Sequence, residues 1–598
     1  MEFTQFHSLF SVMLRNITEI LRPDTFSDSF DVWDEHVLPG ALLSDEACPK
    51  GDGVCILAMI DDAVPLLHPR LTAATEDGRV VSRIASAWLM GAGHDARIGR
   101  QAPTGREIYG TDIDALLETD APGCGLDEER IMRGGGLWDA RRGPLHVGGR
   151  PHGHGAAVID LLTGMDPRDP KALKRPVIAV GLPPEITRDT EGTFSPWFLY
   201  TAMLFILRRA AWIDAKMRSH GHTGPPPPLV VNISYGVTAG SKDGYDMVAR
   251  FLERLSKRGA IPEDEELGEA RTSVGEVRVV LPMGNHRLGR LRARLRPGRS
   301  VFLQVPPGDG SPNFVEIWGA PGIPAEPLEF AITPPGGPEM AIPRGDTRGW
   351  IKEPPTPPEG PPAFRIYKSV QQASEEPVGG PTREVVTLAL PPTEPHGDGM
   401  VDGTGTPGLW RIRSTGSGDI DVHVQRDDVV PGYGDPRLQS RLWSPGYEVR
   451  GPDGRPIEED RDDDETIRRG GTVNTFAAVR SDRLVRAAGR LDRPAGRIAP
   501  YSGLADAHTA PSDREAWGDG AAVADMSASL RGICARGHAA GAVGRASGTS
   551  LAAPQIARAI ADALAAGRPI TDDVLNPPAP VHALDDRATE PPLGSKVQ

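Results

Sequence analysis

The sequence has few cysteines, no long hydrophobic run and no excess of positive charge. Four cysteines in 598 residues are too few for a disulfide framework, and their scatter along the chain fits reduced thiols. A single disulfide between Cys48 and Cys55 remains an alternative. The net charge of −15 argues against nucleic acid as a main partner. The apolar run 197–207 is too short to span a bilayer and ends at Arg208 and Arg209, which predicts a buried helix that packs on a sheet.

The sequence also lacks a recognisable secretory signal. Residues 1–7 have no basic start, and residues 9–14 are too short and too interrupted by polar residues to form an apolar signal core. Together with the few cysteines, this absence predicts a cytoplasmic protein without a membrane partner. A chain of 598 residues is long enough to bury at least two hydrophobic cores.

The most informative stretch is residues 548–554, which read Gly-Thr-Ser-Leu-Ala-Ala-Pro. Gly548 permits a sharp turn, so Ser550 is expected at the N-terminal end of the helix that follows. There, unpaired N–H groups and the helix dipole favour developing negative charge. The stretch therefore predicts an activated nucleophile, and the alternative is a capped helix that carries an ordinary serine.

A serine becomes a strong nucleophile only beside a base that a third group orients, and the chain offers candidates for both. The apolar run 54–60 predicts a strand buried on both faces that ends in Asp61, and open α/β sheets place their sites at this end of a strand. His154 lies on a glycine turn that opens a predicted apolar helix. His152 competes with His154 for the role of base.

The chain order Asp61, His154, Ser550 resembles that of the subtilisin-like serine peptidases, the subtilases. Residues 548–554 match the family's Gly-Thr-Ser-Met-Ala-Ala-Pro motif except at Leu551. The resemblance implies a subtilisin-like fold and makes Ser550 the nucleophile, His154 the base and Asp61 the group that orients it.

The Asp and His motifs depart further from the family pattern. Ala63 stands where the family has a glycine, and Ala156 and Ala157 alter the His motif. The second acid, Asp62, resembles the kexin and furin branch. Aligning the family motif on His154 rather than His152 keeps its glycine and valine in register, which favours His154.

Two further segments complete the resemblance. Residues 277–281 predict a buried strand that runs into Gly284 and Asn285, and in subtilases an Asn at this place donates its amide to the oxyanion. Residues 229–236 resemble the strand that borders the substrate cleft. Ser234, Tyr235 and Gly236 would present backbone to an extended peptide, and Tyr235 would shape the pocket for the side chain before the scissile bond. Gly284 is a further candidate substrate-binding residue.

The segment between Asn285 and Ser550 is much longer than the corresponding segment in subtilases. Seven short apolar or alternating runs between Gly/Pro turns predict an antiparallel β-sandwich there: 301–305, 314–318, 328–332, 364–367, 384–390, 409–413 and 420–424. The predicted fold is therefore α/β, a subtilisin-like parallel sheet flanked by helices and interrupted by an inserted antiparallel β-sandwich. This arrangement resembles a little-described bacterial branch of subtilases.

The same reading divides the chain into five parts. They are an N-terminal extension (1–45), the first part of the catalytic domain (46–290, with an insertion at about 85–150), the inserted sandwich (291–470), the second part of the catalytic domain (471–568) and a tail (569–598). The extension is expected to contain an amphipathic helix that packs on the core, and the alternative is that it covers the cleft. The Pro-rich residues 353–362 read as an extended loop.

The predicted function is a serine endopeptidase that hydrolyses proteins or peptides through an acyl-enzyme. No cofactor is required for this chemistry, and no metal site is predicted. Structural calcium near the acidic run 458–465 is an open possibility that no ligand pattern supports. The alternative is a catalytically silent subtilase fold that binds a partner through its sandwich, which the changes at Ala63, Ala156 and Ala157 keep open. The sequence does not predict an oligomeric state.

Overall fold

A computed structural model describes most of the protein. The described residues are 39–62, 64–93, 96–118, 128–137, 153–187, 190, 192, 195–257, 274–342, 349–350, 364–373, 380–394, 405–429, 436–461, 465–478, 481, 483–491, 497–504, 518–523, 527–530 and 543–578. The predicted N-terminal amphipathic helix, His152, Ala63, the Pro-rich loop 353–362 and the last part of the tail lie outside them.

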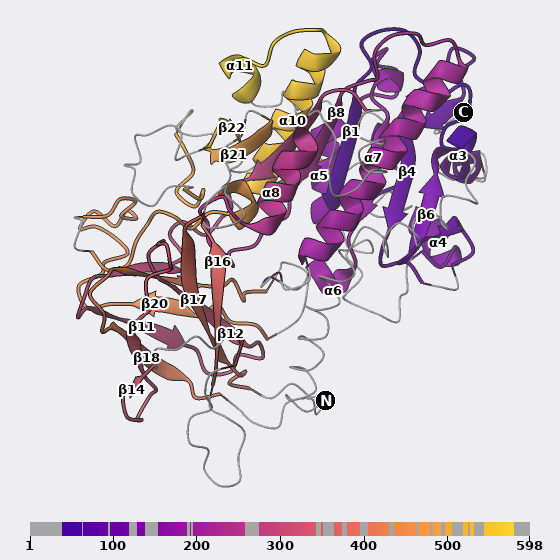
Figure 1. The fold of residues 1–598 in the computed structure, drawn as a ribbon. Helices are drawn as coiled ribbons and strands as arrows, with labels where there is room; N and C mark the ends of the chain where they lie inside the picture. Colours follow the sequence, from indigo (N-terminus) through magenta and orange to yellow (C-terminus); the bar gives the residue numbers. More distant parts are fainter. Residues whose placement is uncertain are drawn as a thin grey trace.

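One large sheet organises the first and last parts of the chain (Figure 1). Its strands are β1 (Ile56–Asp61), β4 (Ile84–Leu89), β5 (Arg100–Gln101), β6 (Arg106–Tyr109), β7 (Val177–Gly181), β8 (Leu229–Ile233), β9 (Val277–Pro282), β21 (Leu484–Arg490) and β22 (Gly520–Val523). The spatial order is β22-β21-β9-β8-β1-β7-β4-β6-β5. All strands from β22 to β4 run parallel, and β6 and β5 add an antiparallel edge.

Helices cover both faces of this sheet (Figure 1). One face packs on α7 (Ser195–Ser219) and α8 (Met247–Ser256), and the other on α5 (His154–Thr163) and α10 (Thr549–Ala565). Successive residues of β1 alternate between the two cores: Ile56, Ala58 and Ile60 belong to the first, and Leu57 and Met59 to the second. Burial on both faces explains why this strand is apolar up to its last residue, Asp61.

Shorter elements complete this part of the chain. They are the hairpin β2 (Thr72–Ala74) and β3 (Val80–Ser82), the pair β23 (Ser527–Leu530) and β24 (Val543–Ala546), the helices α3 (Gly110–Glu118), α4 (Glu128–Gly134), α6 (Pro184–Thr187) and α11 (Asp572–Leu575), and the 3₁₀ turns η1 (Pro39–Ala41), η2 (Pro69–Leu71), η5 (Ala172–Lys174) and η6 (Thr475–Ala478).

The buried helix predicted from the apolar run 197–207 is present and packs on the main sheet, and the apolar run ends at Arg208 and Arg209 although the helix does not. Helix α7 continues past them to Ser219. Arg209 is buried because its guanidinium pairs with the buried Glu107 carboxylate at 2.7 and 2.9 Å and stacks over the Trp212 ring at 3.9 Å. A paired and stacked arginine can remain inside a helix packed on a sheet.

Residues 291–470, here called the insert, separate two neighbouring strands of the main sheet. Strand β9 pairs in parallel with β21, with Val279 opposite Leu484, so the chain leaves the sheet and returns to the adjacent position. The insert lies at the lower left of Figure 1, next to α8. A segment that leaves and re-enters at neighbouring strands does not interrupt the pairing of the sheet.

The insert consists of two antiparallel sheets. The first has the order β10-β19-β12-β17-β16-β15 and the second β14-β13-β18-β11-β20. The strands are β10 (Arg292–Leu295), β11 (Ser300–Val305), β12 (Asn313–Trp318), β13 (Phe330–Thr333), β14 (Met340–Ala341), β15 (Gly349–Trp350), β16 (Arg365–Gln372), β17 (Thr382–Leu390), β18 (Gly408–Ser414), β19 (Ile420–Val424) and β20 (Arg441–Trp443). Each of the seven predicted runs overlaps one of these strands. Residues of both sheets share one hydrophobic core.

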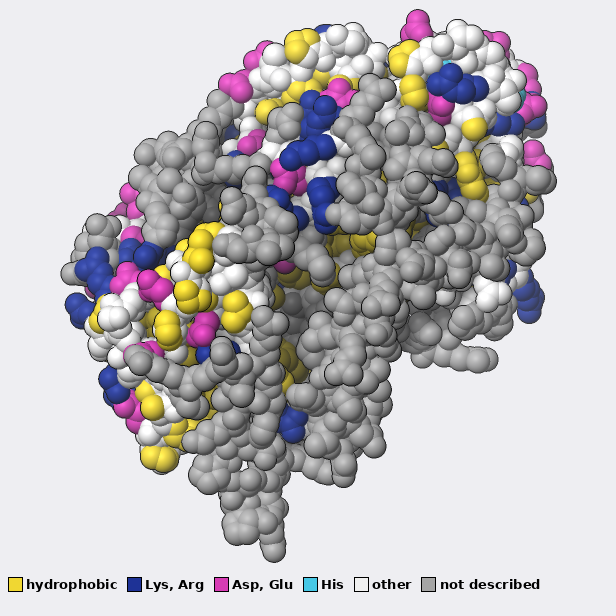
Figure 2. All heavy atoms as spheres, viewed as in Figure 1, with side chains coloured by type: hydrophobic (Ala, Val, Ile, Leu, Met, Phe, Trp, Pro, Cys, Tyr) yellow, Lys and Arg dark blue, Asp and Glu magenta, His cyan; other side chains and the backbone are white. Residues whose placement is uncertain are grey.

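The α/β prediction is confirmed, since a large, mostly parallel sheet flanked by helices is accompanied by separate antiparallel sheets. Cys48 and Cys55 are buried free thiols and do not form the bridge that the sequence left open. Within the described ranges, no helix has the length and apolar composition needed to cross a bilayer. Figure 2 shows basic side chains over α8 and hydrophobic side chains gathered on the visible face of the insert.

Candidate active site

Three predicted residues lie in one hydrogen-bonded line. Asp61 is the last residue of β1, His154 the first of α5 and Ser550 the second of α10. The Nδ1 atom of His154 lies 2.7 Å from Asp61 Oδ1, and its Nε2 atom lies 2.8 Å from Ser550 Oγ. Both ring nitrogens are therefore engaged, one with a carboxylate and one with a hydroxyl. This arrangement can carry a proton from the hydroxyl to the ring.

Gly548 allows the serine to sit this close to its neighbours. A Cβ atom at position 548 would lie 3.2 Å from Ser550 Oγ and 3.3 Å from Asn285 Nδ2. The residue also has a φ of 155°, which side chains rarely adopt. The glycine of the motif is thus required both by its backbone conformation and by the crowding around the hydroxyl.

Two carboxylates set the charge around His154. Asp61 is buried, and its Oδ1 also accepts a hydrogen bond from the Asp62 N–H at 2.8 Å. Asp62 in turn accepts the Gly155 N–H at 2.6 Å, at the start of α5. Burial favours the neutral ring, but the charge and hydrogen bond of Asp61 and the charge of Asp62 outweigh it and raise the pKa of His154 to about 9.

Asn285 is held so that its amide nitrogen faces the serine. Its Oδ1 accepts hydrogen bonds from the Thr549 N–H at 2.8 Å and from Thr549 Oγ1 at 3.0 Å. Because Thr549 supplies two donors, the oxygen of the amide must face it, and Nδ2 then points toward Gly548 and Ser550. The side chain is exposed, so its Nδ2 donors are accessible to a bound molecule.

The predicted substrate-binding residues surround the same place. Ser234 Oγ donates to the Ser550 carbonyl at 2.8 Å and accepts from Asn232 Nδ2 at 2.9 Å, which ties the end of β8 to the start of α10. The Tyr235 hydroxyl donates to the Ile186 carbonyl at 3.3 Å. Gly236 and Gly284 both approach Asn474 closely.

Sequence reasoning missed two residues of this site. Thr549 fixes the orientation of Asn285, and Asn474 lies between Gly236 and Gly284. Thr549 is part of the serine motif 548–554, so the sequence did contain a signal that could have identified this residue. Asn474 lies at the start of the predicted second part of the catalytic domain (471–568), but nothing in the sequence around it marks it as part of the site.

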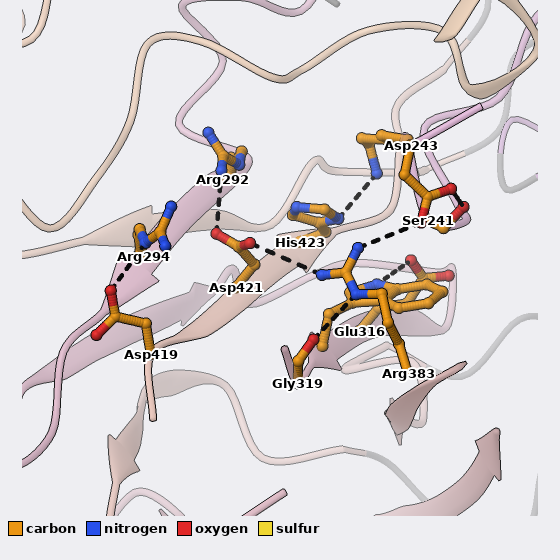
Figure 3. A network of polar contacts seen from close by, with 12 residues as sticks. Ser241, Asp243, Arg292, Arg294, Glu316, Gly319, Arg383, Asp419, Asp421 and His423 are labelled. Atoms are coloured by element: carbon orange, nitrogen blue, oxygen red, sulfur yellow. Dashed lines mark hydrogen bonds and ion pairs between the residues drawn. The ribbon is translucent and has the colours of Figure 1, made fainter. Parts of the chain in front are cut away.

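The segment after Gly236, at residues 240–243, makes polar contacts with the insert (Figure 3). The Gly240 N–H donates to both carboxylate oxygens of Glu316 at 3.1 and 2.9 Å. Lys242 Nζ donates to His423 Nδ1 at 3.1 Å, and Arg383 pairs with Asp243 at 3.4 Å. Burial lowers the pKa of Lys242 to about 8 and holds the pKa of His423 well below its usual value. The insert thus contacts the segment that leads away from the substrate-binding residues.

Glu316→Ala is expected to lower the free energy of unfolding by about 1–3 kcal/mol. Glu316 is buried and also accepts from Trp318 Nε1 at 3.2 Å and from Gln425 Nε2 at 2.8 Å, so the substitution leaves three donors without their shared acceptor. Chemical denaturation measures the loss. The control is Glu339→Ala, which removes an exposed partner of Arg411 and Arg413 and should cost much less, because exposed ion pairs contribute little to stability. Equal losses in the two variants would contradict the account.

The described residues include one group with the spacing of metal ligands. Ligand atoms of Asp61, Asp62 and His154 all lie within 4.8 Å of one another. Binding a cation there would require His154 to give up its bond to Asp61 or to Ser550. In the acidic run 458–465, three of the described carboxylates pair instead with arginines: Glu458 with Arg497, Asp460 with Arg468, and Glu465 with Arg469.

Comparison with known proteins shows likeness in structure but not in sequence. No family model and no curated protein matches the chain. Among solved structures, the chain resembles the CspB protease of Clostridium perfringens, with a TM-score of 0.53 and 16% sequence identity over 90% of this chain and 86% of that one. The fold is subtilisin-like. Because the likeness covers nine-tenths of the chain, it extends over the subtilisin-like sheet and most of the insert.

Proposed function

We propose that the protein is a serine endopeptidase that hydrolyses peptide bonds through an acyl-enzyme. The observation that carries this proposal is the line of hydrogen bonds from Asp61 through His154 to Ser550, at 2.7 and 2.8 Å. The similar solved structure is that of a protease, which supports peptide-bond hydrolysis in general. Protein or peptide substrates follow from this reaction.

In the proposed reaction, Ser550 Oγ attacks the carbonyl carbon of the scissile bond while His154 Nε2 takes the hydroxyl proton. Asp61 keeps the ring oriented and stabilises it when charged. The carbonyl oxygen becomes an oxyanion, to which Asn285 Nδ2 donates. His154 then gives its proton to the leaving amine, and the acyl group stays on Ser550 until water, activated by the same imidazole, releases it.

The substrate is proposed to bind as an extended strand along Ser234, Tyr235 and Gly236. In the described part of the chain, no hydrogen bond engages the backbone N–H or carbonyl of Gly236. These groups are therefore free to pair with a peptide, which binds by adding a strand. Affinity would come mostly from main-chain hydrogen bonds.

The first test is proteolysis by the purified protein. We expect it to cleave casein and to lose this activity after treatment with a serine-directed inhibitor. Buried free thiols at Cys48 and Cys55 agree with a reducing compartment, and we propose the cytoplasm as its location. No cleavage of casein or of a peptide library would favour the silent alternative.

One observation favours a second role for the insert. Six of the seven exposed large hydrophobic side chains among the described residues belong to it: Ile323, Val370, Leu409, Leu438, Trp443 and Val449. Exposed apolar side chains are common on soluble proteins, but their concentration on one part of the chain fits a partner-binding surface. Partner binding through the insert is compatible with catalysis at Ser550. It would be the protein's function in place of catalysis only if Ser550 is inert.

The proposed base gives the reaction an alkaline pH dependence. With a pKa of about 9, the ring of His154 carries a proton at pH 7 and loses it as the pH rises. Only the neutral ring can accept the proton of Ser550, so kcat/KM should rise with pH and reach half its maximum near pH 9. A pH profile on one peptide substrate measures this.

Asp62→Asn should move that rise to lower pH. The substitution removes a negative charge that stabilises the protonated ring, and the asparagine oxygen can still accept the Gly155 N–H. The exposed and remote Asp572→Asn serves as control and should leave the profile in place. An Asp62→Asn profile identical to that of the unsubstituted enzyme would be incompatible with this assignment.

A further inference from the structure

We propose that Asn474 fills the pocket for the residue before the scissile bond, so that the enzyme accepts only small residues such as glycine, alanine and serine there. This inference rests on the proposed function and names the class of substrate. The pocket in question lies between two walls of backbone, Tyr235–Gly236 on one side and Pro282–Gly284 on the other.

Asn474 is in contact with both walls. A Cβ atom at Gly236 would lie 2.2 Å from Asn474 Cγ and Nδ2 and 2.4 Å from its Oδ1, so the whole amide group lies flat against the Cα of Gly236. On the opposite wall, a Cβ atom at Gly284 would lie 3.2 Å from Asn474 N and 3.8 Å from its Cβ. The space between the two glycines is therefore occupied by Asn474 and is not available to a large side chain.

Hydrogen bonds hold the amide in this position. Its Nδ2 donates to the Tyr235 carbonyl at 3.3 Å and to the Pro282 carbonyl at 3.1 Å, one on each wall. Its Oδ1 accepts the Phe476 N–H at 3.1 Å, and its backbone N–H donates to the Met283 carbonyl at 2.9 Å. Only 3% of the residue is exposed. Swinging the side chain out would leave buried carbonyls and an N–H unpaired, which a substrate methylene group cannot compensate.

The position of Asn474 relative to Ser550 links the filled pocket to substrate specificity. Ser234 is bonded to the carbonyl of Ser550, and Gly284 donates its N–H to Thr549 Oγ1 at 3.1 Å, so both walls meet the start of α10. In the proposed binding mode, a peptide that pairs with Gly236 and is attacked by Ser550 projects the side chain before the scissile bond between these walls. A pocket closed by a fixed amide rejects large side chains by steric exclusion.

The test compares peptide substrates that differ only in the residue before the scissile bond. We expect kcat/KM to be at least about tenfold higher with alanine than with phenylalanine, since pocket fit discriminates by such factors. In Asn474→Gly the phenylalanine substrate should gain at least about tenfold, while the alanine substrate changes by less than about threefold. Asn474→Ala should show a smaller gain, because it keeps the Cβ atom.

The outcomes separate this inference from the proposed function. Cleavage after phenylalanine as efficient as after alanine in the unsubstituted enzyme overturns the inference but not the peptidase. An unchanged ratio in folded Asn474→Gly and Asn474→Ala also overturns it. If both variants fail to fold, the ratio of kcat/KM for the alanine and phenylalanine substrates of the unsubstituted enzyme tests the inference by itself. Failure to cleave any member of the series, together with no reaction at Ser550, overturns both.

Discussion

Replacing Ser550 with alanine is expected to abolish proteolysis, with a loss on the order of 10⁶ in kcat. The substitution removes the attacking atom, and the remaining site has no other hydroxyl bonded to His154 Nε2 among the described residues. The fold should persist, because the hydroxyl makes one bond to a ring whose side chain is 39% exposed and can bond to water instead. Casein cleavage and thermal unfolding measure the two effects.

Ser219→Ala is the matched control for this substitution. Ser219 is exposed at the end of α7, and its hydroxyl donates to the Lys216 carbonyl at 2.7 Å and lies 3.2 Å from His220 Nδ1. This variant should retain full activity and the same melting temperature. If Ser550→Ala cleaved casein at a rate near that of Ser219→Ala, the nucleophile would have to be another residue.

Asn285→Ala is expected to lower kcat by about 10²–10³ with little change in KM, because the lost donor acts on the oxyanion and not on the bound substrate. The fold should again persist, since Asn285 is exposed and water can satisfy the Thr549 donors that it leaves. Steady-state kinetics on one peptide substrate separate the two constants.

Asn232→Ala is the contrasting variant. Asn232 is buried and its Nδ2 donates to Ser234 Oγ, so its loss should reduce stability rather than act selectively on kcat. A rise in KM without a fall in kcat for Asn285→Ala would mean that this side chain binds the ground state. That result would remove it from the proposed mechanism.

Much of the fold follows from local sequence. The strands at the centre of the main sheet are buried on both faces, so β1 up to Ile60 and β8 apart from Asn232 are apolar. The insert strands show the alternation of a sheet with one buried face, as in β19, where Ile420, Val422 and Val424 point into the shared core. The helix starts at His154 and Thr549 follow from glycine turns next to apolar periodicity.

What the sequence did not reveal depends on contacts between distant residues. Strands β10 and β20 are short and carry arginines, so pairing with neighbours rather than apolar pattern defines them. The extension of α7 past Arg209 depends on Glu107, which lies 102 positions away in the chain. The contact of Asn474 with Gly236 likewise spans two parts of the chain that the insert separates. No local pattern encodes such partners.

Labelling with a fluorophosphonate probe tests the central claim most directly. A nucleophilic serine bonded to a base reacts covalently with this reagent, whereas ordinary serines do not. We predict one labelled peptide, containing Ser550, and no labelling in Ser550→Ala or His154→Ala. Labelling that persists in Ser550→Ala, or a folded protein that does not react at pH 9, would contradict the account.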